Sequence, residues 1–169
     1  DHYETVYKDE GYEVLHNTQA FERAFLVSDY VVQTDDQKIL DMFYSDDFDK
    51  RHSVILETQP ESKPEAGEGK TTIIAYEPNR VVVQTESPVA KILVLTDVYD
   101  PGWRAHVDGK DSNVYRADYD FRAVSLSAGN HTVEFYYWPK DLSIALVVSG
   151  MIGTILILGG VASYGRRFI

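Results

Sequence analysis

From residue 71 to residue 139, short apolar runs alternate with polar residues and are separated by turn residues. This period-two pattern is typical of β-strands that bury one face. The strands expected here are "TTIIAYE", "RVVVQTE", "KILVLTDVY", "WRAHVD", "KDSNVY", "FRAVSL" and "HTVEFYYW". In the last strand, Val133, Phe135 and Tyr137 fall on one face. Seven such strands predict a mainly β chain with an antiparallel β-sandwich, jelly-roll-like or Ig-like, over residues 71–139.

Residues 1–58 show a mixed pattern. Residues 1–24 are polar and weakly patterned, whereas "AFLVSDYVV" and "SVILET" have the composition of short strands. Between them, "DDQKILDMFY" carries apolar residues at helical spacing, with Thr34 or Asp35 as its N-cap. A small α+β unit is therefore expected over residues 1–58. Residues 59–70, "QPESKPEAGEGK", are rich in Pro, Gly and Glu and predict a linker or a long exposed loop.

Residues 142–164 contain no Asp, Glu, Lys, Arg, Asn or Gln. A helix of about 20 such residues crosses the hydrocarbon core of a bilayer. A buried core helix is the alternative, but soluble domains rarely contain so long an uncharged run. The sequence therefore predicts one transmembrane helix over residues 142–164, followed by a short tail over residues 165–169.

Charge is distributed unevenly about this helix. All 27 acidic residues and 14 of the 16 basic residues precede residue 142, so the segment before the helix carries a net charge of −13. Such an acidic domain repels nucleic acid, which we exclude as a partner. Arg166 and Arg167 follow the helix, and basic residues stay cytoplasmic. The C-terminus is therefore expected in the cytoplasm and residues 1–141 outside the cell membrane, with Trp138 and Tyr164 at the two interfaces.

An extracytoplasmic domain needs a signal for export. The chain begins at Asp1 without a signal peptide, so we expect a fragment whose upstream membrane segment performed the export, or a chain whose signal was cleaved. Small residues recur in the helix at i, i+4, as in Ser149 and Gly153. They predict packing against other transmembrane helices of the same parent protein or of an oligomer, in addition to membrane lipid.

No catalytic constellation stands out in the sequence, and the five histidines lack metal-ligand spacing. The acidic run "SDDFDKRHS" lacks the glycine and the terminal glutamate of an EF-hand loop. A solvated acidic surface is the expected role of these carboxylates, with Ca²⁺ binding as the alternative. We expect no other metal and no cofactor. Cysteine is absent.

Aromatic and polar residues near the turns of the sandwich suggest a glycan-binding surface. Sugars are bound by aromatic faces flanked by Asp, Asn and Arg side chains, and the candidates are Tyr119, Arg122, Asp97 and Tyr99. Trp103 alternates with Ala105 and is expected in the core. A second feature of the surface is the sequence Asn130-His131-Thr132, an N-glycosylation sequon.

The strings "DVYDPGWRAHVDGK" and "YRADYDFRAVSLSAGNHTVEFYYWP", followed by a membrane helix, resemble the C-terminal end of the YfhO family. These are large polytopic membrane proteins of the GT-C glycosyltransferase type. The strings "AFERAFLVSDYVV" and "SVILE" are also similar to that family's extracytoplasmic region, although Glu22 stands where the family pattern has proline. The matching positions with an expected architectural role are Pro101, Gly102, Trp103, Asp108, Gly109 and Gly129, the glycines and Asp108 in tight turns.

The resemblance implies lipid-linked sugar transfer outside the cytoplasmic membrane by the parent protein. Its essential acidic residues would lie in an early loop between membrane helices, so this chain alone is expected to be non-catalytic. We hypothesise an accessory domain that binds or positions a cell-surface glycan acceptor, or caps the active-site cavity. The rival hypotheses are a membrane-anchored carbohydrate-binding module and a purely structural or interaction domain.

Overall fold

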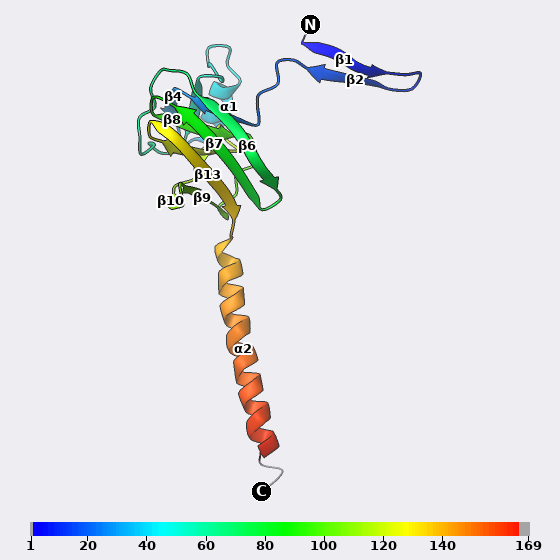
Figure 1. Cartoon of the computed structure of the whole chain (residues 1–169), viewed down its shortest axis with the longest axis vertical. Helices are drawn as coiled ribbons and strands as arrows, with labels where there is room; N and C mark the ends of the chain where they lie inside the picture. The colour runs from blue at the N-terminus through cyan, green and yellow to red at the C-terminus, as the bar shows by residue number, and fades with distance from the viewer. Residues whose placement is uncertain (1, 166–169) are drawn as a thin grey trace.

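The computed structural model describes the backbone of residues 2–165, with the side chains of residues 2–139 and 141–158. It shows a protruding hairpin, a two-layer β-sandwich and a long C-terminal helix (Figure 1). The strands are β1 (Tyr3–Lys8), β2 (Glu13–Asn17), β3 (Ala24–Val27), β4 (Asp29–Val32), β5 (Ser53–Leu56), β6 (Lys70–Glu77), β7 (Arg80–Ser87), β8 (Lys91–Leu95), β9 (Trp103–Val107), β10 (Lys110–Ser112), β11 (Tyr115–Ala117), β12 (Phe121–Leu126) and β13 (Gly129–Tyr137). The helices are α1 (Asp36–Phe43) and α2 (Lys140–Gly165).

The sandwich consists of two sheets. One sheet has the strand order β10-β9-β13-β7-β6 and the other has the order β3-β8-β12-β11-β5-β4. All pairs are antiparallel except β4 and β5, which are parallel. A parallel pair requires a crossover, and α1 lies within that connection. Asp35 caps α1 by accepting a hydrogen bond from the Lys38 backbone N–H at 3.0 Å. The expectation of a mainly β chain with an antiparallel sandwich and a C-terminal apolar helix is confirmed.

The sandwich draws strands from both sides of the expected linker. β3 pairs with β8, with Ala24 opposite Leu95, and β5 pairs with β11. β3, β4 and β5 therefore share a sheet with β8, β11 and β12, whereas β1 and β2 form a separate two-stranded sheet. The physical reason lies in β8, whose five residues are all buried. A strand that is apolar on both faces is stable only with neighbouring strands on both sides and a covering layer on each face.

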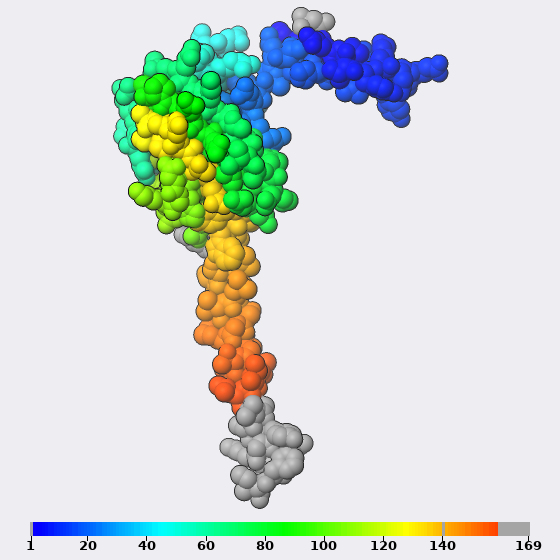
Figure 2. All heavy atoms as spheres, viewed as in Figure 1, coloured from blue at the N-terminus to red at the C-terminus, as the bar shows by residue number. Residues whose placement is uncertain are grey.

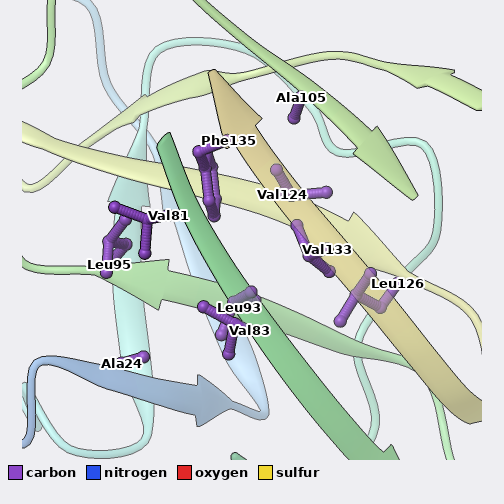
Figure 3. Packing of buried hydrophobic residues seen from close by; sticks show 10 residues of the cluster. All are labelled: Ala24, Val81, Val83, Leu93, Leu95, Ala105, Val124, Leu126, Val133 and Phe135. Atoms are coloured by element: carbon purple, nitrogen blue, oxygen red, sulfur yellow. The ribbon is translucent and has the colours of Figure 1, made fainter. Parts of the chain in front are cut away.

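Two apolar clusters cover the two faces of the six-stranded sheet. The inner cluster lies between the sheets and consists of Ala24, Val81, Val83, Leu93, Leu95, Ala105, Val124, Leu126, Val133 and Phe135 (Figure 3). The outer cluster includes Ile92 and Val94, the residues of β8 that alternate with Leu93 and Leu95. Each inner residue is under 5% exposed. Burial on this scale provides the main stabilisation of a domain that has no cysteine.

Residues 59–69 are hydrogen-bonded to the strands of the six-stranded sheet and lead into β6, which begins at Lys70. The backbone N–H of Glu61 donates to the Tyr115 hydroxyl at 3.1 Å, and that of Ser62 donates to Ser125 Oγ at 3.0 Å. The buried Lys91 donates from Nζ to the Gly67 carbonyl at 2.5 Å. The segment that we expected as a linker or exposed loop is thus fastened to the sandwich at three points.

The expected strand "KDSNVY" is divided between the layers. β10 ends at Ser112 in one sheet, and β11 begins at Tyr115 in the other. The hairpin between β9 and β10 is the tight turn expected from its sequence, with φ of 52° at Asp108 and 77° at Gly109. Gly129, with φ of 131°, opens β13 after the turn that follows β12. These two turns lie at the same end of the sandwich, because the Asp108 N–H donates to the Thr132 carbonyl at 2.9 Å.

The N-terminal hairpin β1–β2 extends away from the sandwich as an arm (Figures 1 and 2). The strands pair antiparallel, with Tyr3 opposite Asn17 and a bulge between Thr5 and Tyr7. Every residue of β1 and β2 is exposed except Asn17, which is intermediate. This pairing was not expected from the weak pattern of residues 1–24.

The C-terminal helix α2 leaves the sandwich from the end of β13 (Figure 1). Its segment Asp141–Leu158 has a mean hydropathy of 2.2 and is not buried against the rest of the chain. By length and composition, this is the one helix within residues 2–165 that could cross a membrane. Tyr164 belongs to α2, whereas Arg166 and Arg167 lie outside the described residues.

Candidate functional site: the groove beside the membrane helix

One end of the sandwich is joined to α2, and we call it the proximal end. Here the Trp138 backbone N–H donates to the Gly102 carbonyl at 2.8 Å, and Trp103 pairs with Tyr137 across β9 and β13. A Cβ added at Gly102 would come within 2.7 Å of Tyr137 Cε2. Only glycine allows this approach, which supports the architectural role expected for Gly102 and binds the start of β9 to the base of the helix.

A groove of about 340 Å³ lies at the proximal end along the edge of β9. It forms because the β9–β10 pairing ends at Ala105 and Ser112, so that the edge of β9 at Trp103 and Arg104 has no neighbouring strand. Among the lining residues are three aromatic side chains, which are Tyr99, Trp103 and Tyr136, and four polar ones, which are Arg104, Asp111, Ser112 and Asn113. The groove therefore offers ring faces beside hydrogen-bonding groups.

The polar groups of the groove are held in place by neighbours. His106 Nε2 lies 3.0 Å from Asp111 Oδ1 and 3.3 Å from the Tyr136 hydroxyl, and its ring stacks on Tyr136 with centroids 4.7 Å apart. Asn113 Nδ2 donates to Glu61 Oε1 at 2.6 Å. A surface that combines aromatic rings with carboxylate and amide groups is suited to hydrogen bonding with a polyhydroxylated ligand.

Arg122 does not belong to this surface. Its side chain is 2% exposed, and its guanidinium carbon lies 3.7 Å from the centroid of the Trp103 ring. Nη2 donates to Asp97 Oδ2 at 2.9 Å, while Nε and Nη1 have no hydrogen-bond partner among the described residues. Burial lowers the pKa of the Arg122 guanidinium, and the nearby Asp97 charge opposes this shift. A side chain so buried does not reach a surface glycan, so the structure contradicts glycan binding by Arg122 and supports the architectural role that the family resemblance also implies for it.

Asp97 joins the two sheets through several contacts. Besides Arg122, its carboxylate accepts hydrogen bonds from Arg23 Nη1 at 2.7 Å and from the Tyr76 hydroxyl at 3.1 Å. The Arg23 guanidinium also lies 5.0 Å from the centroid of the Tyr76 ring. Trp103 packs against the inner cluster, as expected, and adds an edge contact with Tyr137 at 5.3 Å. This network closes the proximal end of the sandwich.

The four candidate glycan-binding residues do not form one site. Asp97 and Arg122 pair with each other beneath Trp103, and Tyr99 lines the groove. The Tyr119 ring instead lies 4.7 Å from the Arg116 guanidinium, which bonds Glu57 at 2.8 Å. Glycan binding by Tyr119 remains a prediction for a separate surface.

A second hollow, of about 310 Å³, lies beside α1 and the outer face of the six-stranded sheet. It is lined by the four phenylalanines Phe21, Phe25, Phe43 and Phe121. Lys50, Thr96 and Asp118 complete the lining. Asp118 is 7% exposed, and its Oδ1 accepts a hydrogen bond from the Ile55 N–H at 2.8 Å. Burial raises the pKa of Asp118 to about 7, against the opposing effects of the Ile55 bond and the Lys50 charge.

Acidic residues do not gather into a metal site in the described part of the chain, where no three His, Cys, Asp or Glu side chains converge. Asp46, Asp47 and Asp49 are all exposed, and Asp49 Oδ2 lies 2.8 Å from His52 Nδ1. The Ca²⁺ alternative therefore has no coordinating cluster in residues 2–165.

Sequence reasoning named Tyr99 as a binding residue but assigned Trp103 only to the core, and it missed Tyr136, Asp111 and Asn113 as groove residues. The reason is that they come from different segments. Asp111 lies in β10, Asn113 lies between β10 and β11, and Tyr136 lies in β13. A weak signal was present in the polar centre of "KDSNVY", where Ser112 and Asn113 interrupt an otherwise strand-like run. The hollow beside α1 had no sequence signal, because its phenylalanines come from separated segments.

The chain is similar to known membrane proteins over about half of its length. A family model described as "Bacterial membrane protein YfhO" matches residues 62–149, which is just over half of the chain. A protein of Bacillus subtilis (strain 168) described as "Uncharacterized protein YfhO" is 24% identical over 80 residues. That match covers 47% of this chain and only 9% of the relative. No solved structure matches the chain.

Proposed function

Because the chain belongs to the YfhO family of bacterial membrane proteins, we propose that it is a glycan-binding accessory domain with a terminal membrane helix. The parent protein in this proposal is a polytopic glycosyltransferase that uses lipid-linked sugars. The groove at the proximal end binds the sugar acceptor and positions it near the membrane surface. The chain supplies binding, whereas the chemistry belongs to other parts of the parent.

One observation carries this proposal. The groove, with its rings and polar groups, lies at the end of the sandwich that is hydrogen-bonded to Trp138, two residues before α2 begins. The lipid-linked donor presents its sugar at the bilayer surface, so a groove that positions the acceptor for transfer is expected near a membrane helix. The hollow beside α1 is lined mainly by phenylalanine and offers fewer polar groups to a sugar.

Glycan binding by the full chain in lipid nanodiscs tests the groove. The probe is an array of bacterial surface oligosaccharides, and the variant is Tyr99→Ala. We expect binding by the unmodified chain and a loss of roughly tenfold for the variant, which corresponds to about 1.4 kcal/mol. Tyr44→Ala is the matched control, because Tyr44 is 75% exposed and lies at the end of α1.

The outcomes separate the rival functions. Binding that Tyr99→Ala leaves unchanged contradicts the groove, and Tyr119→Ala then tests the other aromatic surface. Complete absence of binding favours a structural or interaction domain. A parent protein that retains full sugar transfer without residues 71–138 would contradict the accessory role altogether.

The proposal also requires the sandwich to lie outside the cytoplasmic membrane. Arg166 and Arg167 after the helix support this orientation. Asn130 and Thr132 are exposed at the start of β13, so the sequon can serve as a topology marker. In microsomal membranes, we expect a chain targeted by an upstream signal to be glycosylated at Asn130, and Thr132→Ala to abolish the modification. If the sandwich stays accessible to protease outside the microsomes and carries no glycan, the orientation is reversed.

A further inference from the structure

The loop between β8 and β9, residues 96–102, crosses from one sheet to the other at the proximal end. It leaves the six-stranded sheet at Leu95 and enters the five-stranded sheet at Trp103. Because it passes between the layers at the end that carries α2, it forms part of the surface that faces the membrane. We call it the proximal loop.

Hydrogen bonds hold the proximal loop at a defined position relative to α2. The Gly102 carbonyl accepts from the Trp138 N–H at 2.8 Å, and the Trp138 indole Nε1 donates to Ser143 Oγ at 2.8 Å. Ser143 lies within the apolar segment Asp141–Leu158. The loop is therefore linked through Trp138 to a residue in the first turn of the membrane span.

The interior of the loop is also ordered. The Tyr99 N–H donates to the Asp120 carbonyl at 2.7 Å, which fastens the loop to the turn before β12. Asp100 Oδ1 accepts from the Gly102 N–H at 2.7 Å. The loop thus presents a fixed surface toward the bilayer and does not depend on ordering upon contact.

The proximal loop has an exposed apolar side chain, Val98, next to an aspartate, Asp97, that forms ion pairs with two arginines. Val98 is 65% exposed, and Trp138, which is bonded to the loop, is 43% exposed. The Asp97 carboxylate is 13% exposed and bonded to Arg23 and Arg122, so it presents little negative charge to lipid. Asp97 therefore adds little to the repulsion that anionic headgroups would meet around Val98, whereas the exposed Asp100, whose Oδ1 accepts from the Gly102 N–H, keeps its charge at this surface.

We propose that the proximal loop lies in the headgroup layer of the bilayer and that Val98 inserts at the boundary with the acyl chains. Apolar side chains of interfacial segments reach about 5–10 Å into this region. The partner is a lipid surface, and the apolar side chain of Val98 makes the contact. It rests on α2 as a membrane span; Tyr99 of the same loop lines the groove, but the lipid contact at Val98 requires no bound glycan.

The chain contains no cysteine, so a single introduced cysteine can be labelled at a chosen position. An environment-sensitive fluorophore is attached at Val98→Cys in the full chain, reconstituted in nanodiscs that contain lipids with a nitroxide near the headgroup. Val6→Cys is the matched control, because Val6 is 60% exposed on the arm away from α2 (Figure 1). We expect several-fold stronger quenching and a blue-shifted emission at position 98.

Equal quenching at the two positions overturns the proposal. Loss of the difference at high salt also overturns it, because an apolar contact is not screened by ions. Persistence of the difference at high salt supports it. The glycan array and this probe measure different properties, so a failure of one proposal leaves the other measurable.

Discussion

The sandwich and the N-terminal arm both consist of paired strands, but only the sandwich buries the apolar side chains of its strands. In β13, Val133 and Phe135 alternate with polar residues and are fully buried. In β1, Tyr3 and Tyr7 are each 54% exposed, although the strand is paired with β2 on both sides of its bulge. The difference is a second sheet, which faces β13 and is absent from the arm. Pairing satisfies the backbone, but only a facing layer removes apolar side chains from water.

The largest expected effect compares one leucine in each region. Leu93→Ala removes a side chain that is 0% exposed between the sheets, and Leu15→Ala removes one that is 52% exposed on β2. We expect the first to lower the free energy of unfolding by about 2–5 kcal/mol and the second by less than about 0.5 kcal/mol. Urea denaturation of the full chain in detergent micelles, followed by tryptophan fluorescence from Trp103 and Trp138, measures both. Equal losses would show that the arm is part of the cooperative fold.

A smaller effect compares two aspartates. Burial raises the pKa of Asp118 in the sandwich to about 7, whereas a hydrogen bond from the Tyr7 hydroxyl and two backbone N–H bonds lower the pKa of Asp9 in the arm. Between about pH 4 and pH 7, folded Asp118 binds a proton that the unfolded chain has released. The stability of the sandwich therefore falls as the pH rises through this window, by on the order of 4 kcal/mol at most.

Substitution by asparagine separates these two aspartates. In Asp118→Asn, the neutral amide keeps an oxygen for the Ile55 N–H and asparagine tolerates the positive φ of 48°, so we expect a gain of roughly 1–3 kcal/mol at pH 8 and little at pH 4. Asp9→Asn should leave the unfolding of the sandwich unchanged at both pH values, because Asp9 is bonded only within the arm. Thermal unfolding at the two pH values measures this. A pH-independent effect of Asp118→Asn would contradict the buried carboxyl.

The smallest expected effect is removal of the arm. Deletion of residues 1–17 stops before Gln19, whose carbonyl accepts a hydrogen bond from Arg51 at 2.9 Å. We expect the free energy of unfolding of the sandwich to change by less than about 0.5 kcal/mol, because β1 and β2 bury almost no side chain. Urea denaturation of the truncated chain in micelles, followed by circular dichroism, measures it. A large loss would mean that the arm packs on the sandwich in solution.

Much of the fold could be predicted from local pattern. The turn at Asp108 and Gly109, the helix after Asp35 and the apolar run of α2 each follow from a few neighbouring residues. The candidate site could be predicted less well. Tyr99 lies in the groove, but the partners that give the groove its polar character arrive from β10, β13 and the connection to β11. Such convergence depends on sheet order, which local alternation does not encode.

The sequence by itself determined that this protein has two parts, an acidic β-rich domain and one apolar helix. Charge and hydropathy are properties of each residue, and they decide whether a segment favours water or lipid before any tertiary contact forms. Tertiary structure alone decided which residues share a surface. It buried Arg122 beneath Trp103, brought β3 and β5 into the sheet of β8, and placed the proximal loop against the base of α2. The physical reason is that these contacts join residues far apart along the chain, and their free energies become available only when both layers have formed.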